Sequence, residues 1–336
     1  MKVFMIGGTG LLGSQAANEL INRGHEVKTL SLPPVPKGAK LNKKMEVELG
    51  NFVELSDEQL AQKMQGFDAF IFAAGVDERV EGPAPIYDLY KKYNIDPIYR
   101  FLGIGQKVGI KKAVILGSYF SYFAKKHPEW KLIENHPYIR ARIDQEKAAQ
   151  SFANDMDVAV LELPYIFGTQ PGRKPVWVFL ADMILKNKKD SLMYTKGGTT
   201  MVTVKQVGEA IAGALEVNKG FNTYPIGYFN MTWTQLLPIF GKAIGKEIKV
   251  KTIPSFLYVL GGMQQMKQFK KRGVDSGLNM IKFKVLQTSN LFIDKEEGCD
   301  KLGVKDDDIV KAISDSAILS ADVALNKVKV IDMKAE

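Results

Sequence analysis

Cysteine and histidine are scarce in this chain. Cys299 is the one cysteine among 336 residues, and there are three histidines. A single cysteine excludes a disulfide within the chain and is typical of a reducing compartment, so we expect a cytoplasmic protein. No cysteine or histidine pair has the spacing of a zinc site, so we expect no metal. No internal repeat or low-complexity segment occurs.

Long hydrophobic runs are also missing. The apolar stretch at 256–263 is too short to span a bilayer. The chain opens directly on a predicted strand, so we expect no signal peptide. Apolar residues recur at helical spacing over 255–271 and are followed by lysines. Such a helix would touch a membrane or an acidic partner. More commonly, the apolar side of such a helix packs against the protein and its lysine-rich end is solvated. We favour this arrangement and expect no membrane partner.

Positive charge is concentrated in one part of the chain. The net charge is +9, with +1 over residues 1–170, +12 over residues 171–289 and −4 over residues 290–336. The middle segment would attract an anionic substrate. A solvated lysine-rich surface explains the excess equally well. Charge alone is weak support for nucleic-acid binding, so we expect no nucleic-acid partner.

Glycine, by contrast, is placed with regular spacing near the start of the chain. The apolar run 3–6 predicts a short buried strand. Gly7, Gly10 and Gly13 follow at the spacing of a dinucleotide-binding turn. They permit a tight exit from the strand, a close approach of backbone to a diphosphate, and close packing of the next helix. That helix, predicted over 14–23, would turn its free N–H groups and positive dipole end toward the phosphates.

Short apolar runs alternate with amphipathic stretches in the first half. Strands are predicted at 26–32, 45–49, 69–74, 112–116 and 158–163, and helices at 56–64, 86–109 and within 137–155. Further helices are predicted at 177–186, 206–216, 233–244 and 255–271. This alternation predicts an α/β fold with a parallel sheet covered by helices on both faces.

The chain resembles the extended short-chain dehydrogenase/reductase family of nucleotide-sugar epimerases, dehydratases and related reductases. The resemblance is carried by GGTGLLG at 7–13, LGNF at 49–52, FAAG at 72–75, YNIDP around Asn94, LGSYFSY at 116–122, PYIRARIDQE at 137–146, LPYIFG at 163–168, MVTVKQVGEAIAGAL at 201–215, YPIG at 224–227 and DKEEGCDKLG at 294–303. It implies a Rossmann-type doubly wound parallel sheet with a smaller C-terminal substrate-binding lobe. Residues 1–169 would bind NAD(P), with a returning segment near 200–230, and residues 170–336 would form mainly the lobe.

The resemblance also implies catalytic residues. In that family a tyrosine is the general acid/base, a lysine four residues later lowers its pKa, and a serine at the preceding strand end orients the substrate oxygen. The matching positions are Tyr138, Arg142 and Ser118, and Asn94 matches a helix asparagine near the site. Arginine in place of the lysine still supplies a positive charge. Its planar fork differs from an ammonium in reach, and it stays charged, so it cannot share protons in a relay.

The cofactor residues implied by the resemblance are Gly7, Thr9, Gly10, Leu11, Leu12, Gly13, Ser31, Asn51, Phe52, Ala73, Ala74, Gly75, Asn94, Tyr138, Arg142, Pro164, Tyr165 and Ile166. No acid stands after the second predicted strand, where one would hold the adenosine ribose. Ser31 with nearby Lys37 and Lys40 favours NADP over NAD. Asn51 replaces the usual aspartate, and its amide oxygen can still accept a hydrogen bond from an adenine amino group.

Two functions remain open on the sequence. The first is an NAD(P)-dependent oxidoreductase or epimerase that moves a hydride at a hydroxyl or carbonyl carbon of a small, anionic or sugar-like substrate. The second is a non-catalytic NAD(P)-binding redox sensor or binding module, which the arginine at position 142 favours. The helices around Asn94 and over 138–149 resemble those that pair across a two-fold axis in the family, so we expect a homodimer.

Overall fold

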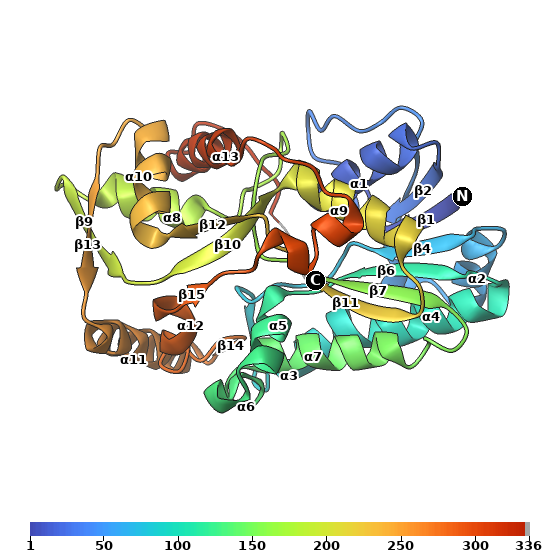
Figure 1. The fold of residues 1–336 in the computed structure, drawn as a ribbon, viewed down its shortest axis with the longest axis horizontal. Helices are drawn as coiled ribbons and strands as arrows, with labels where there is room; N and C mark the ends of the chain where they lie inside the picture. Colours follow the sequence, from blue (N-terminus) through green and yellow to red (C-terminus); the bar gives the residue numbers. More distant parts are fainter. Residues whose placement is uncertain (333–336) are drawn as a thin grey trace.

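A parallel sheet of seven strands forms the centre of the computed structural model, which describes residues 1–332 (Figure 1). The strand order is β3-β2-β1-β4-β6-β7-β11, and every neighbouring pair is parallel. The strands are β1 (Lys2–Ile6), β2 (Glu26–Ser31), β3 (Glu46–Leu49), β4 (Ala69–Phe72), β6 (Lys112–Leu116), β7 (Asp157–Glu162) and β11 (Phe221–Pro225). The order reverses direction on either side of β1, so the predicted doubly wound sheet is confirmed.

Helices cover both faces of this sheet. Helices α1 (Leu11–Asn22) and α9 (Val204–Val217) lie on the upper face in Figure 1. The lower face carries α2 (Asp57–Met64), α4 (Asp96–Val108), α5 (Tyr119–Lys126) and α7 (Pro137–Gln150). Helices α1 and α9 pack closely, because a Cβ on Gly208 would lie 2.8 Å from the carbonyl oxygen of Gln15. The first half of α9 therefore packs directly against α1, the helix that follows the glycine turn.

The single helix predicted over 86–109 is interrupted. The structure has α3 (Tyr87–Tyr90), a π-turn η2 (Lys91–Ile95) and then α4, which ends at Gly109 with φ of 90°. Pro97 at the start of α4 has no N–H to donate to the preceding turn, which favours a wider turn at this point. The interruption brings Asn94 to the bend.

A smaller C-terminal lobe packs against the sheet, at the left of Figure 1. Its larger sheet joins β8 (Tyr165–Phe167), β10 (Gly198–Thr203), β12 (Phe229–Thr232) and β15 (Asn290–Leu291), and a second pair joins β9 (Ser191–Thr195) with β13 (Lys249–Ile253). Its helices are α8 (Val178–Lys186), α10 (Trp233–Ala243), α11 (Ser255–Arg272), α12 (Lys284–Thr288) and α13 (Ile309–Ala324). Helix α13, absent from the sequence prediction, packs with α8 and α10 around a third buried cluster.

Several short elements connect these layers. They are β5 (Glu81–Gly82) paired with β14 (Asp275–Ser276), helix α6 (Leu132–Asn135), and 3-10 turns at Phe52–Glu54, Pro128–Trp130, Lys295–Glu297 and Asp300–Leu302. The pairing of β5 with β14 ties the loop after β4 to the segment that follows α11.

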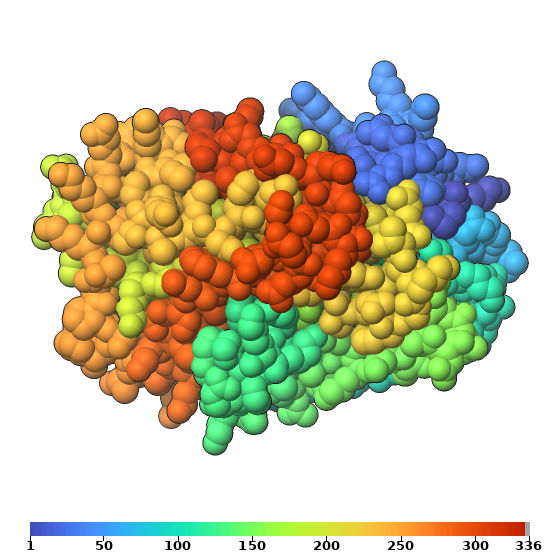
Figure 2. Space-filling view, viewed as in Figure 1, coloured from blue at the N-terminus to red at the C-terminus, as the bar shows by residue number. Residues whose placement is uncertain are grey.

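The sequence predicts that the apolar side of α11 packs against the rest of the protein, and this prediction is wrong. Phe256, Leu257, Leu260 and Met263 are between 40% and 61% exposed, and α11 lies at the lower left of the surface in Figure 2. The helix contacts the lobe through Gly262, where a Cβ would lie 2.7 Å from the carbonyl oxygen of Met280. The buried residues of α11 are Gly262 and Phe269, and the apolar row does not face inward. No helix within residues 1–332 is long and apolar enough to cross a membrane.

Candidate functional site

The predicted site residues lie after the carboxyl ends of the parallel strands. Gly7 follows β1, Ser31 ends β2, Ala73 follows β4, Ser118 follows β6 and Pro164 follows β7. Because the strands are parallel, these ends meet at one edge of the sheet. The strand order reverses between β1 and β4, where a Cβ on Gly7 would lie 2.6 Å from the carbonyl oxygen of Ala73. In open α/β sheets, ligands bind in the crevice at such a point.

The glycine turn has the form needed to hold a diphosphate. Gly7 has a φ of +89°, and a Cβ on Gly13 would lie 2.3 Å from the carbonyl oxygen of Gly7. Helix α1 begins with neither a side-chain cap nor an acid in its first turn. The N–H groups of Leu11, Leu12 and Gly13 meet no acceptor within residues 1–332. These free donors at a positive dipole end fit the diphosphate of a dinucleotide.

Two hydroxyl side chains of β2, Ser31 and Thr29, bind the backbone of this turn. The Ser31 hydroxyl is buried and accepts the Thr9 N–H at 3.2 Å. Thr29 accepts the Gly8 N–H at 2.8 Å and lies 3.1 Å from the Ser31 hydroxyl. The Ser31 side chain is therefore engaged with the turn in this structure. The preference for NADP, which rests partly on Ser31, stays a prediction.

Asn51 and Phe52 lie at the end of β3. The Asn51 side chain accepts the Val53 N–H at 3.1 Å and donates to Glu54 at 3.0 Å, so it caps a short 3-10 turn. Phe52 packs edge-on against Phe101 with ring centroids 5.4 Å apart. Both residues thus serve local structure, and their contact with an adenine is a prediction.

The segment Pro164 to Ile166 leads from the sheet into the lobe. Pro164 is buried, and Tyr165 and Ile166 are half-buried in β8, which pairs with β10. The Ile166 carbonyl accepts the indole N–H of Trp177 at 3.0 Å. The Tyr165 ring lies 5.2 Å from the same indole, centroid to centroid. This segment joins the strand ends to Trp177 in the lobe.

Arg142 and Tyr138 form a hydrogen bond one turn apart on α7. The Arg142 Nε–H donates to the Tyr138 hydroxyl at 3.1 Å. The terminal nitrogens donate to the carbonyls of Leu116 at 3.2 Å and Val76 at 3.3 Å, and to the Gln145 side chain at 2.9 Å. Four of the five guanidinium N–H groups therefore have protein acceptors. The guanidinium is fixed in place as a cation beside the tyrosine.

A buried network extends from this pair to the π-turn. Gln145 donates to the Asn94 carbonyl at 2.9 Å. The Asn94 side chain binds both backbone groups of Val76, at 2.8 Å and 2.9 Å. Gly75 has a φ of +116°, and a Cβ there would lie 2.4 Å from the Asn94 amide oxygen. Asn94 therefore fixes the loop after β4, and the predicted residues Ala74 and Gly75 lie on that loop.

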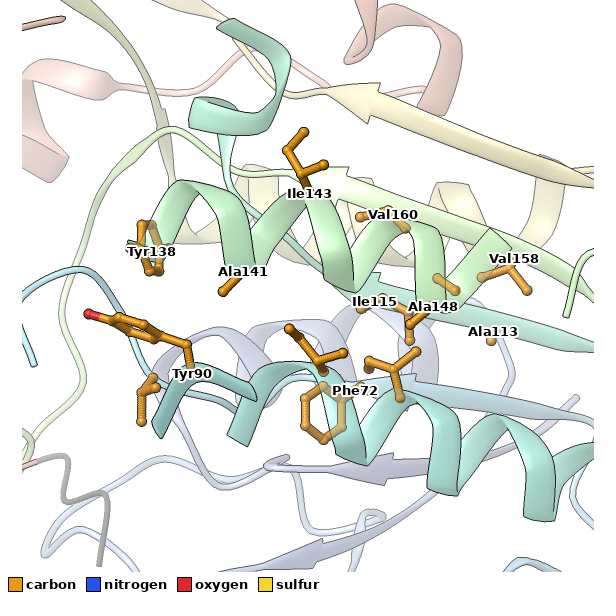
Figure 3. Packing of buried hydrophobic residues seen from close by; sticks show 14 of the residues in the cluster. Phe72, Tyr90, Ala113, Ile115, Tyr138, Ala141, Ile143, Ala148, Val158 and Val160 are labelled. Atoms are coloured by element: carbon orange, nitrogen blue, oxygen red, sulfur yellow. The ribbon is translucent and has the colours of Figure 1, made fainter. Parts of the chain in front are cut away.

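Tyr138 is almost fully enclosed. It is 3% exposed, and its ring packs edge-on against Tyr90 at 5.4 Å (Figure 3). Its backbone N–H donates to the Gly277 carbonyl at 3.0 Å, so a segment of the C-terminal lobe covers it. Burial raises the pKa of Tyr138, and the adjacent Arg142 cation opposes that shift. The pKa of the Tyr138 phenol therefore depends on the balance between burial and the Arg142 charge.

Ser118 lies at the end of β6, where it caps α5. Its hydroxyl accepts the Phe120 N–H at 3.4 Å. The side chain is 5% exposed and makes no hydrogen bond to Tyr138 or Arg142 in the described part of the chain. Ser118 and Tyr138 thus lie at the same sheet edge, with no hydrogen bond between them within residues 1–332.

Glu78 is a site residue that the sequence reasoning missed. Burial and the neighbouring Asp77 carboxylate raise the pKa of Glu78 to about 7. The Glu78 carboxylate raises the pKa of Tyr90, Tyr138 and Tyr165, so its charge is felt at the proposed acid/base. The run Asp77-Glu78-Arg79 directly follows a buried strand and Gly75, and that position was the available signal. Over residues 1–332, no group of three or more histidine, cysteine, aspartate or glutamate residues could hold a metal ion.

One curated relative matches part of this chain. Over 121 residues the chain is 25% identical to a 3-beta-hydroxysteroid dehydrogenase of Mycolicibacterium neoaurum. That match covers 35% of this chain and spans about a third of the relative, 32% of its length. Its activity is therefore that of the relative alone.

Solved structures share the fold over nearly the whole chain. The structure of gox2253 has a TM-score of 0.72 at 16% identity, covering 97% of this chain and 99% of the other. UDP-glucose 4-epimerase from Bifidobacterium longum, in complex with NAD+ and UDP, has a TM-score of 0.67 at 15% identity, covering 96% and 98%. MoeE5 in complex with UDP-glucose and NAD has a TM-score of 0.64 at 14% identity, covering 95% and 98%.

The sequence model of one protein family matches a range that contains the glycine turn, Asn94 and α7. It matches residues 3–227, which is more than half of the sequence. The chain belongs to the NAD dependent epimerase/dehydratase family.

Proposed function

We propose that this protein binds NAD(P) at the glycine turn and catalyses hydride transfer at a hydroxyl or carbonyl carbon of a small substrate. The observation that carries the proposal is the hydrogen bond from Arg142 to the Tyr138 hydroxyl at 3.1 Å, at the sheet edge that also holds the uncapped start of α1. A phenol beside a fixed cation is a suitable proton donor and acceptor near a reacting oxygen.

Each residue has a distinct role in the proposed reaction. The N–H groups of Leu11 to Gly13 bind the diphosphate. The bound nicotinamide would supply the hydride chemistry. Tyr138 gives or takes the proton at its phenolic oxygen, and Arg142 stabilises its anionic form. Ser118 orients the substrate oxygen. A product that stays bound and is reduced again gives epimerisation, whereas a product that leaves gives net oxidation or reduction.

The proposed substrate is sugar-like or anionic. Two of the similar folds, the epimerase and MoeE5, hold UDP or UDP-glucose. The positive charge of residues 171–289 in the lobe fits an anionic group. Residues 1–169 would then serve mainly the cofactor and residues 170–336 mainly the substrate.

A second function is favoured by the way Arg142 is used. Four of its N–H groups are engaged by the protein, and Tyr138 is buried with a raised pKa. A protein that binds NAD(P) and signals its redox state, without turnover, would retain these features. A homodimer through α4 and α7 and a cytoplasmic location are compatible with both functions and complete the proposal.

Titration calorimetry with NAD+ and NADP+ tests the cofactor site. Wild type should bind at least one of them. Gly10→Glu should bind neither well, because a Cβ at this position lies 3.2 Å from the Gly7 carbonyl and the carboxylate would repel the diphosphate. Gly261→Glu is the matched control, since nothing lies within 4 Å of a Cβ there. No heat for wild type with either dinucleotide would refute the proposed function.

A further inference from the structure

A segment of the chain crosses over the glycine turn. Residues 170–174, called the strap below, follow β8 and precede α8. The Gln170 amide donates to the Thr9 carbonyl at 3.0 Å and lies 3.3 Å from the Ser14 hydroxyl. A Cβ on Gly172 would lie 2.3 Å from the carbonyl oxygen of Lys37. The strap therefore rests both on the glycine turn and on the loop after β2.

The strap is also held from its outer side. The Lys174 N–H donates to the Ile331 carbonyl at 3.0 Å, and the Ile331 N–H donates to the Gly172 carbonyl at 2.9 Å. Lys174 forms an ion pair with Asp332 at 2.6 Å. These bonds fix the backbone on both sides of Arg173, so the position of its side chain is constrained.

Arg173 holds its guanidinium over the glycine turn. A Cβ on Gly10 would lie 3.7 Å from a terminal nitrogen of Arg173. The side chain makes no hydrogen bond or ion pair within residues 1–332. Burial lowers the pKa of Arg173, and the more distant Asp332 only partly offsets this. A partly desolvated cation without a paired anion is unfavourable.

Two positive features thus converge on one place. The start of α1 has free N–H groups, a positive dipole end and no acid in its first turn. Arg173 adds a full charge beside Gly10, the residue that precedes α1. Both would be stabilised by the same anionic group lying over Gly10.

We propose that Arg173 binds the diphosphate of the dinucleotide, so that the strap and the start of α1 together clamp the cofactor. The proposal rests on the proposed function, because it assumes that a dinucleotide occupies the glycine turn. The planar guanidinium can bind two phosphate oxygens at once, which an ammonium group cannot match in geometry. The clamp also couples cofactor binding to the C-terminal lobe, since the strap leads directly into α8.

Calorimetry with NAD+, NADP+, ADP-ribose and adenosine on Arg173→Leu tests the clamp. Affinity for NAD+ and for ADP-ribose should each fall about 10- to 100-fold, the effect of losing a charge-assisted hydrogen bond. Affinity for adenosine, which lacks the diphosphate, should not change. Lys188→Gln removes a charge from an exposed residue that follows α8 and lies outside the strap, and it should leave all four affinities within about twofold of wild type.

Other outcomes overturn the clamp without touching the proposed function. Unchanged NAD+ affinity in Arg173→Leu would do so. A loss confined to NADP+ would assign Arg173 to the 2′-phosphate instead. An equal loss for adenosine would mean that the substitution disrupts the site as a whole. Arg173→Gln provides a second neutral variant, and Arg173→Lys, which keeps the charge, should lose less affinity than either. Absence of dinucleotide binding in wild type would instead refute the proposed function itself.

Discussion

Arg142 donates its Nε–H to the hydroxyl of Tyr138 at 3.1 Å, across one turn of α7. The spacing of four residues places the two side chains on one face of the helix. The guanidinium carbon also lies 5.1 Å from the centroid of the Tyr138 ring. Acceptors on β6, on the loop after β4 and on α7 itself hold the cation there. Arginine at this position is therefore a rigid partner of the phenol, with one N–H left over.

Removing the Tyr138 hydroxyl should abolish turnover. In Tyr138→Phe we expect the rate to fall by a factor of about 10²–10⁴, the usual effect of losing a positioned acid/base. Cofactor affinity should stay near that of wild type. The measurement is nicotinamide absorbance over a panel of alcohols and carbonyl compounds. Tyr90→Phe, which removes a hydroxyl from the ring packed against Tyr138, is the control and should lose far less. Unchanged activity in Tyr138→Phe would end the catalytic assignment.

Replacing the cation should move the pH dependence. If tyrosinate is the base, activity in the oxidative direction rises with pH through the pKa of Tyr138. The Arg142 cation lowers that pKa, so Arg142→Met should shift the rise to higher pH. Arg142→Lys keeps a positive charge and should retain measurable activity. A pH series of initial rates for the three proteins decides. A sensor would show no turnover in any of them, and NADPH and NADP+ would give wild type different conformations.

Glu78 should shift the pH dependence of activity in the direction opposite to Arg142. Its negative charge raises the pKa of Tyr138. Glu78→Gln should therefore move the rise in activity to lower pH and remove any inflection near its own pKa of about 7. Glu81→Gln is the control, because that acid lies on the same loop but pairs with Arg272 at 2.7 Å. Identical pH profiles for wild type and Glu78→Gln would show that Glu78 does not face the reacting group.

Much of the cofactor domain could be predicted from the sequence. Glycine spacing and short apolar runs reflect local constraints, so β1, β6 and the capped start of α2 at Ser56 appear near their predicted positions. The carboxyl ends of parallel strands then fix where Gly7 and Ser118 must lie. The interruption at Asn94 was missed. Pro97 was the available signal, but a proline is also common in the first turn of an ordinary helix, so it does not by itself indicate a π-turn.

The rest depends on distant parts of the chain. Gly277 covers Tyr138 from more than a hundred residues away, and no local pattern indicates this contact. Arg173 looks like one of many basic residues in the lobe until the strap is placed over Gly10. The apolar row of α11 has the period of a packed helix, yet Gly262 faces the lobe. Periodicity finds an apolar face but does not say whether another element covers it.

The proposed dimer can be tested at α4. Tyr99 on this helix is 50% exposed, with its ring 6.4 Å from that of Phe152. If α4 and α7 pair across a two-fold axis, Tyr99→Glu would bury charges at the interface and should give a monomer. Light scattering on both proteins measures the change. Val310→Glu, at a residue 48% exposed on α13, is the control and should keep the wild-type mass. A monomeric wild type would refute the dimer.

A buried acidic pair lies one helical turn further along α7 from Arg142. Glu162 at the end of β7 is 1% exposed, and Glu146 on α7 is 6% exposed. The two carboxylates share the Lys125 ammonium, at 3.0 Å and 2.9 Å. Burial, and the repulsion of Glu146, raise the pKa of Glu162 to about 8 from an ordinary value of 4.5. One lysine cannot fully stabilise two buried carboxylates, so the folded protein keeps a proton on this pair.

Stability should therefore depend on pH through Glu162. In the unfolded chain this carboxyl ionises near 4.5, whereas in the folded protein it holds its proton to about 8. Between these values the folded state binds more protons, so the free energy of unfolding should fall as pH rises. Glu162→Gln removes this contribution and should become more stable than wild type toward pH 8, by an amount on the order of a few kcal/mol. Urea denaturation across the pH range measures the difference. Glu134→Gln, at an exposed residue of α6, should follow wild type at every pH. If the free energies of unfolding of Glu162→Gln and wild type instead differed by a constant amount from about pH 5 to about pH 9, Glu162 would be ionised in the folded protein.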